Sequence, residues 1–408
     1  MFSKYPSTTS IIKNIKSEQG YIVHSQYYPL PENKVLFLTK DQKREATTLK
    51  TFLTEALQTH LAENTLKGDW NLVCIFPDGS ILLNTRSKLI KLCPASLNIL
   101  ASQSWIGDLY SNSVGVIDNN TFFAITNNKT YFLSIYKWNK DSFIESSKTP
   151  LPTQPKNGSA TIENVQSLGK NRYSYHWRGH NTSEFRISVF EINPNNNEVQ
   201  ELGVIIPKAQ RAGNDSRASG NCIALANGQL LTYHMNYNNV QIWDTKTCTC
   251  IKEWSWKNIQ KPNDFKYYRE TCLKIIPFPD CKNLLIYNSN SAHFFLFNTD
   301  TQVMKRIKLA HGVAYYGEHH ILPNGQVLAF VESESPNTTK IVQFDLPEMI
   351  SYRKLIHESQ KVAAWFLRKN NCPKPIIQYI FSFAFTSESK ALLAKKIEEK
   401  NEPNCLIM

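Results

Sequence analysis

The residues best suited to chemistry in this chain are the last four, Cys405-Leu406-Ile407-Met408. A cysteine, two aliphatic residues and a methionine at a C-terminus form the C-a-a-X signal, at which farnesyltransferase attaches a lipid to the cysteine thiol. We therefore expect lipidation at Cys405, with Leu406, Ile407 and Met408 as the recognition residues. The alternative is a tail in which these residues occur together by chance. Apart from the covalent farnesyl group, no cofactor is expected.

The lipidation signal also predicts a location. Prenyltransferases act in the eukaryotic cytosol, so we expect a peripheral protein at the cytosolic surface of a membrane. The nine cysteines are an odd number and are scattered along the chain, unlike the paired framework of a small secreted domain. Residues 1–20 lack the apolar core of a secretory signal, and no apolar run is long enough to span a bilayer. The sequence thus predicts reduced thiols and no transmembrane helix.

Charge gives a weaker indication of partners. The formal net charge is +12 over 408 residues, but the lysines and arginines are spread along the chain. Because they form no basic block, we do not expect nucleic-acid binding. Lys208, Arg211 and Arg217 make one locally basic stretch, which is a candidate contact for acidic partners. The alternative is an ordinary solvated loop.

A repeated phrase organises most of the chain: a short apolar strand, a polar turn, a second strand, a polar gap and two further strands. Its clearest copy covers residues 222–256, with the turn Asn227-Gly228 and the dipeptide Trp243-Asp244. Equivalent turns recur roughly every 40 to 60 residues, which is typical of four-stranded propeller blades. Since a blade cannot bury both apolar faces alone, the blades are expected to stack radially and to close into a ring.

The copy at residues 222–256 resembles a WD40 blade, with Trp243-Asp244 in the place of the signature dipeptide. Weaker copies lack the dipeptide, and together they predict an all-β propeller of about seven four-stranded blades over residues 1–350. One stretch, residues 45–66, has apolar residues at helical spacing and predicts a helical insertion. His60 lies on or beside its apolar face, where a packing role is expected.

The segment 351–400 is predicted to be helical, and residues 401–408 to be a flexible tail that carries the prenylation signal. Residues 372–383 resemble the opening helix of an F-box, in which proline precedes an apolar helix. This resemblance implies a Skp-type linker subunit of a ubiquitin ligase as the partner. The contact residues would be Ile376, Ile377, Ile380 and Phe381. Too few residues remain before Cys405 for the usual helical domain, so a helical cap on the propeller is the competing interpretation.

Short catalytic motifs are missing. The sequence contains no Gly-rich phosphate loop, no Gly-x-Ser-x-Gly elbow and no His-Glu-x-x-His helix. Cys248 and Cys250 have the wrong spacing for a zinc finger, and strand alternation would place both on one face, so we expect packing and no metal site. The histidine pairs His176/His180 and His319/His320 lie near predicted loops and are candidates to line a propeller mouth.

Three functions follow from these observations. The first is a non-enzymatic protein-interaction scaffold, tethered to a eukaryotic membrane through Cys405, whose protein partner the sequence does not identify. Divergent blades and a composition rich in Asn, Lys and Ile also suggest an effector that an intracellular bacterium delivers into a host cell. The second is a substrate-selecting adaptor of a ubiquitin ligase. The third is an enzyme with an unrecognised site in the propeller mouth.

Overall fold

The structure is a computed structural model, and every named element in the part of the chain that it describes is a β-strand. It describes residues 10–16, 24–31, 34–40, 43–53, 60–105, 109, 113–128, 130–139, 142–151, 160–179, 185–207, 221–234, 239–255, 258–260, 262, 273–288, 294–307, 319–321, 326–332 and 338–344. The predicted helical segment 351–400, its F-box-like residues and the tail lie outside these residues.

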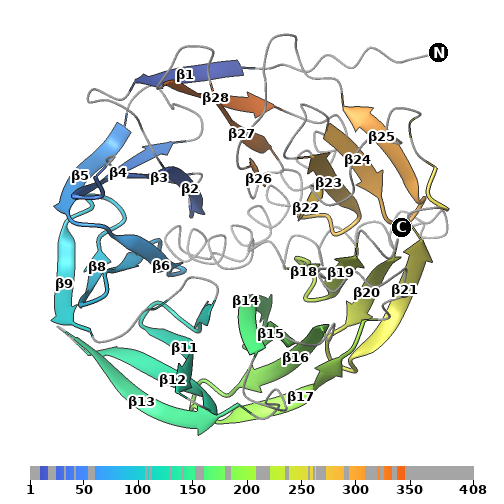
Figure 1. Ribbon diagram of the computed structural model, residues 1–408, viewed down its shortest axis with the longest axis horizontal. Coiled ribbons are helices and arrows are strands. Elements are labelled where there is room, and N and C mark those ends of the chain that lie inside the picture. The colour runs from blue at the N-terminus through green and yellow to red at the C-terminus, as the bar shows by residue number, and fades with distance from the viewer. Residues whose placement is uncertain are drawn as a thin grey trace, which may run out of the picture.

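The strands form seven four-stranded antiparallel sheets arranged as blades around a ring (Figure 1). In six of the sheets the four strands follow one another as a meander. The first three blades contain β2 (His24–Leu30), β3 (Lys34–Lys40), β4 (Ala46–Leu53) and β5 (His60–Lys67); β6 (Asn71–Ile75), β7 (Ile81–Asn84), β8 (Lys88–Leu92) and β9 (Ile99–Ser104); and β10 (Val114–Val116), β11 (Thr121–Asn128), β12 (Thr130–Asn139) and β13 (Ser142–Pro150).

The next three blades repeat the same order. They contain β14 (Ala160–Gly169), β15 (Arg172–Gly179), β16 (Phe185–Ile192) and β17 (Val199–Ile205); β18 (Asn221–Ala224), β19 (Leu230–His234), β20 (Asn239–Asp244) and β21 (Thr249–Ser255); and β22 (Leu273–Pro277), β23 (Asn283–Asn288), β24 (Phe294–Asn298) and β25 (Val303–Ile307). The prediction of an all-β propeller is confirmed.

The seventh blade closes the ring with strands from both ends of the described chain. Its order is β1 (Ser10–Lys16), β28 (Thr338–Phe344), β27 (Val327–Glu332) and β26 (His319–Ile321). Strand β1 pairs antiparallel with β28, with Ser10 opposite Gln343. The first strand of the described chain therefore supplies the outermost strand of the blade that contains the last one, which ties the two ends together (Figure 1).

The prediction of a helical insertion at residues 45–66 is wrong. In the described parts of that stretch, residues 45–53 and 60–66, β4 and β5 are formed and pair with each other in the first blade. Thr47, Leu49 and Thr51 alternate on the buried side of β4, so two threonines fill positions that an apolar-only pattern misses. β-branched threonine packs well on a pleated surface, and the true period is two.

The core lies between the blades. Each of five apolar clusters in the described residues combines side chains of two adjacent sheets. Between the fifth and sixth blades, for example, Leu231 and Ile242 pack with Leu284 and Phe295. Burying one such side chain contributes about 1.5–3 kcal/mol, so the blades hold one another in the ring.

Polar turns fix the hairpins of each blade. Asp78, Asn227 and Asp244 each accept a hydrogen bond from the backbone N–H two residues later. Such Asx turns reverse the chain within a few residues. In the fifth blade, Trp243 Nε1 of β20 donates to Thr232 Oγ1 of β19 at 2.9 Å, which joins this tryptophan to the second strand of its blade.

Candidate functional site

A polar pocket lies between the first and second blades. It has a volume of about 240 Å³ and is lined by Gln26 of β2, Leu38 and Lys40 of β3, Arg44 of the β3–β4 connection and Asn71 of β6. In an antiparallel meander, the connection after the second strand and the connection to the next blade lie at the same end. The end of β3 and the start of β6 therefore meet at one face of the ring.

Local hydrogen bonds hold the connection between the two blades beside this pocket. Thr47 Oγ1 donates to Gly68 O at 2.8 Å and accepts from Trp70 N at 3.0 Å, while Gly68 N donates to Glu45 O at 2.6 Å. Gly68 has a φ of +108°, which favours glycine. The connection turns sharply here and presents Asp69 to β3.

Lys40 is the central charge of the site. Its side chain is 9% exposed, and its Nζ lies 2.5 Å from Asp69 Oδ1 and 2.8 Å from Asn71 Oδ1. Arg44 is more exposed, at 54%, and lies 3.7 Å from Asp69 Oδ2. Because Asp69 compensates one of the two cations, these three residues together carry one net positive charge.

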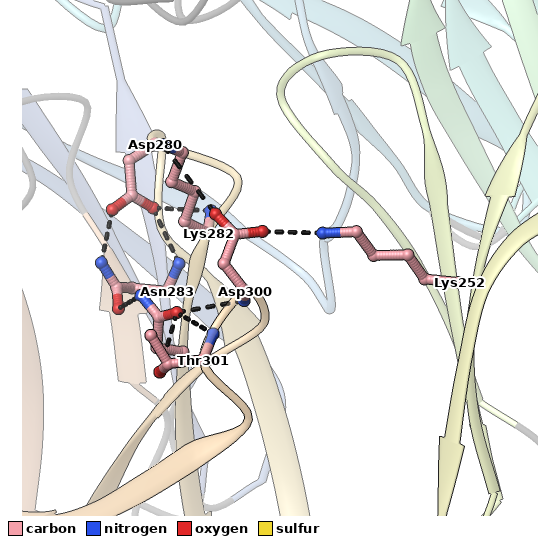
Figure 2. Close-up of polar contacts among 7 residues, drawn as sticks. Lys252, Asp280, Lys282, Asn283, Asp300 and Thr301 are labelled. Carbon is pink, nitrogen blue, oxygen red and sulfur yellow. Dashed lines mark hydrogen bonds and ion pairs between the residues drawn. The ribbon is translucent and has the colours of Figure 1, made fainter. Parts of the chain in front are cut away.

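A second polar cluster lies at the opposite face, between the fifth and sixth blades. Figure 2 shows Asp300 between two lysines: Lys252 Nζ of β21 is 2.7 Å from Asp300 Oδ1, and Lys282 Nζ is 3.9 Å from Oδ2. Asp280 accepts from the backbone N–H of Lys282 at 3.1 Å and of Asn283 at 3.0 Å. Burial raises the pKa of Asp280 despite these bonds. The cluster joins two hairpins to a neighbouring blade.

Lys91 is buried like Lys40, and it joins the second and third blades. Its Nζ donates to Asn119 O at 3.0 Å and lies 4.6 Å from the ring centre of Phe76 and 5.5 Å from that of Trp138. Burial lowers the pKa of Lys91. The carbonyl and the aromatic faces together replace part of the lost hydration, which indicates a structural role.

Only some of the predicted site residues lie in the part of the chain that the structure describes. Cys405, Leu406, Ile407 and Met408 lie outside the described residues, as do Ile376, Ile377, Ile380, Phe381, Lys208, Arg211, Arg217 and His180. His319 and His320 begin β26, the innermost strand of the seventh blade. These predictions stay predictions.

His176 lies within β15, three residues before its end, is 7% exposed, and its ring centre is 5.3 Å from that of Phe185. One expectation about described residues is wrong. Cys248 and Cys250 do not share one strand face, because Cys248 ends the turn before β21 with a φ of +53° and Cys250 is exposed on that strand. Within the described residues, no group of three potential metal ligands occurs.

Sequence reasoning missed the pocket itself. Lys40 ends a buried strand and Arg44 lies in the polar stretch that follows, and that was the available signal. Asn71 lies in the next blade, so its contact with Lys40 follows only from the ring. Among the described residues, no helix is long and apolar enough to cross a bilayer.

No protein-family model and no curated protein matches the chain. Among solved structures, it is similar to a chain from a study of two prolyl endopeptidases, with a TM-score of 0.52 and 10% identity over 79% of this chain and 47% of that one. This chain thus spans about half the length of that structure.

Two further structures are similar over nearly their whole length. The Cps50 (Swd1) β-propeller domain of Myceliophteria thermophila has a TM-score of 0.49 and 8% identity, covering 82% of this chain and 99% of that one. Sqt1 of Saccharomyces cerevisiae has a TM-score of 0.47 and 10% identity, covering 81% and 98%. At such identities a likeness concerns the fold alone. The closed ring of sheets, together with the likeness to the endopeptidase chain, makes this protein a β-propeller.

Proposed function

We propose that this protein is a non-enzymatic protein-interaction scaffold. The observation that carries the proposal is the polar pocket between the first two blades, where Lys40 and Arg44 face a cavity at a loop-bearing face of a rigid ring. Loops and strand ends held by a rigid scaffold are well suited to binding, because their side chains are already positioned. The pocket offers charge and hydrogen-bond donors to a partner side chain.

Quantitative proximity labelling in eukaryotic cells tests the scaffold role. The wild-type protein is expected to enrich a small set of partners, and Arg44→Glu is expected to reduce them, because the charge of the exposed cation is reversed. Lys246→Glu, in the exposed turn before β21 at the opposite face, is the matched control. Equal enrichment by all three proteins would refute a role of the pocket, and no enrichment by any of them would refute the scaffold.

The second part of the proposal is a lipid tether. The C-a-a-X residues support farnesylation of Cys405 and a peripheral position at the cytosolic surface of a eukaryotic membrane. The same features support delivery as a bacterial effector, since the lipid would be added by the host. Intact mass and membrane fractionation of the wild type and Cys405→Ser test this. An unmodified wild type that fractionates like the variant would overturn it.

A ubiquitin-ligase adaptor is the second candidate. The apolar spacing of Ile376, Ile377, Ile380 and Phe381 after Pro373 and Pro375 favours it. Co-purification of a Skp-type linker subunit is the expected result, and its loss in the Ile376→Asp/Ile380→Asp variant would locate the contact. A wild-type protein that retains no linker subunit would exclude this function.

A further inference from the structure

The amide groups of the pocket between the first two blades are oriented by their own hydrogen bonds. Asn71 Oδ1 accepts from Lys40 Nζ at 2.8 Å, and an ammonium group donates only, so this assignment of the amide is forced. Gln26 Oε1 accepts from Tyr28 OH at 2.9 Å. Both side-chain oxygens are thus engaged, and each amide keeps its NH₂ group for another partner.

Lys40 has a donor to spare as well. An ammonium group has three N–H donors, and Lys40 uses two of them, on Asp69 and Asn71. Within the part of the chain that the structure describes, no acceptor is found for the NH₂ groups of Gln26 and Asn71. The polar lining of the cavity therefore offers N–H donors from Gln26, Lys40, Arg44 and Asn71, and the Asp69 carboxylate beside it engages part of the Lys40 ammonium.

We propose that this pocket binds an oxyanion, and that the oxyanion is the carboxylate of an acidic side chain of a partner protein. A group of N–H donors with a net positive charge is complementary to an anion, and Asp69 compensates only one of the two cations. The net charge of the protein is +12, so acidic segments are attracted to it over a distance. This inference rests on the proposed scaffold function and names the chemistry of its partner.

The local charge favours a carboxylate over a phosphate group. Lys40, Arg44 and Asp69 together carry one positive charge, because Asp69 pairs with Lys40 at 2.5 Å. A carboxylate carries one negative charge and is matched by this set, whereas a phosphate monoester carries about −1.5 to −2 at pH 7 and would leave negative charge uncompensated. The cavity volume of about 240 Å³ holds a carboxylate side chain with several waters.

Asn71→Asp tests the donor argument with little structural change. The aspartate has the same shape and still accepts from Lys40 Nζ, but it replaces the NH₂ donor with an acceptor and removes the net positive charge. Asn227→Asp is the control: it changes the net charge equally, in an exposed Asx turn at the opposite face whose oxygen still accepts from Gln229 N.

The experiment is calorimetric titration of the purified full-length protein with a hexaglutamate peptide, a hexaglutamine peptide and inorganic phosphate. We expect the wild type to prefer hexaglutamate, Asn71→Asp to weaken its binding at least ten-fold, and Asn227→Asp to change it less than two-fold. Equal weakening by both variants would refute the pocket, and tighter binding of phosphate would refute the carboxylate. Because no cellular partner is needed, this result is separate from that of the proximity labelling.

Discussion

Two hairpin glycines provide a sharp test of how closely the blades pack. Gly79 and Gly228 occupy the turn between the first two strands of the second and fifth blades, with φ values of +84° and +81°. A Cβ added to Gly79 would lie 3.3 Å from Pro94 Cβ, whereas one added to Gly228 would lie 2.7 Å from Leu168 O in the fourth blade. The two positions have nearly the same φ but very different surroundings.

The magnitudes follow from these distances. Alanine in the left-handed region lowers the free energy of unfolding by about 1–2 kcal/mol, and this applies to both variants. The contact at Gly79 requires a shift of a few tenths of an ångström, but Leu168 lies in β14 with its side chain packed in the core between two blades, so its carbonyl cannot move as easily. Overpacking of that kind costs about 1–3 kcal/mol more. We therefore expect Gly228→Ala to lower the free energy of unfolding by about 2–5 kcal/mol.

Thermal unfolding followed by tryptophan fluorescence compares the two variants. With a shift of about 2 °C per kcal/mol for a domain of this size, Gly79→Ala should lower Tm by about 2–4 °C and Gly228→Ala by about 4–10 °C. Similar shifts in the two variants would show that the left-handed conformation alone sets the cost. That result would refute the argument that the hairpin is in tight contact with the neighbouring blade.

Three further predictions concern single interactions. Trp243→Phe should destabilise the protein by about 1–2 kcal/mol, because Thr232 Oγ1 is buried and loses its donor; combining it with Thr232→Val should cost less than the two single changes together, and simple additivity would contradict the bond. The raised pKa of Asp280 means that the folded state holds its proton more tightly than the unfolded chain. Stability relative to Asp280→Asn should thus fall as pH rises from about 4 through the folded pKa, and a Tm difference independent of pH would contradict this. Gln302 has a φ of +55°. Because asparagine tolerates this conformation better, Gln302→Asn should stabilise the folded protein by about 0.5–1 kcal/mol. A variant with a lower Tm than the wild type in thermal denaturation would contradict this explanation.

The repeat was predictable because its signals are local. Polar turns such as Asn227-Gly228 combine an Asx side chain with a glycine at positive φ, so the hairpin is encoded within a few residues. The Trp243 contact with Thr232 also lies within one blade. Residues that make their decisive contact inside one hairpin or sheet can therefore be recognised from sequence alone.

Contacts between blades were not predictable in the same way. Lys40 contacts Asn71 across the boundary between two sheets, and the pairing depends on how the ring places the end of β3 beside the start of β6. The mistaken helix at residues 45–66 has a related cause. Buried threonines of β4 face the neighbouring strands and blades, and without that context Thr47 and Thr51 count as polar.

The outermost strands show why exposed apolar residues here do not by themselves indicate docking surfaces. In five blades the pairing of the third and fourth strands shifts by one residue, which is a β-bulge in the outer strand. Leu61, Leu100 and Ile251 are the extra residues in three of them, and each is about half exposed. A bulge twists a free edge and interrupts its regular ladder, which hinders pairing with a further strand. The bulge that protects the edge also turns these three side chains outward, so their exposure follows from edge protection. The orientation of the Gln26 and Asn71 amides in the pocket near Lys40 has no such explanation.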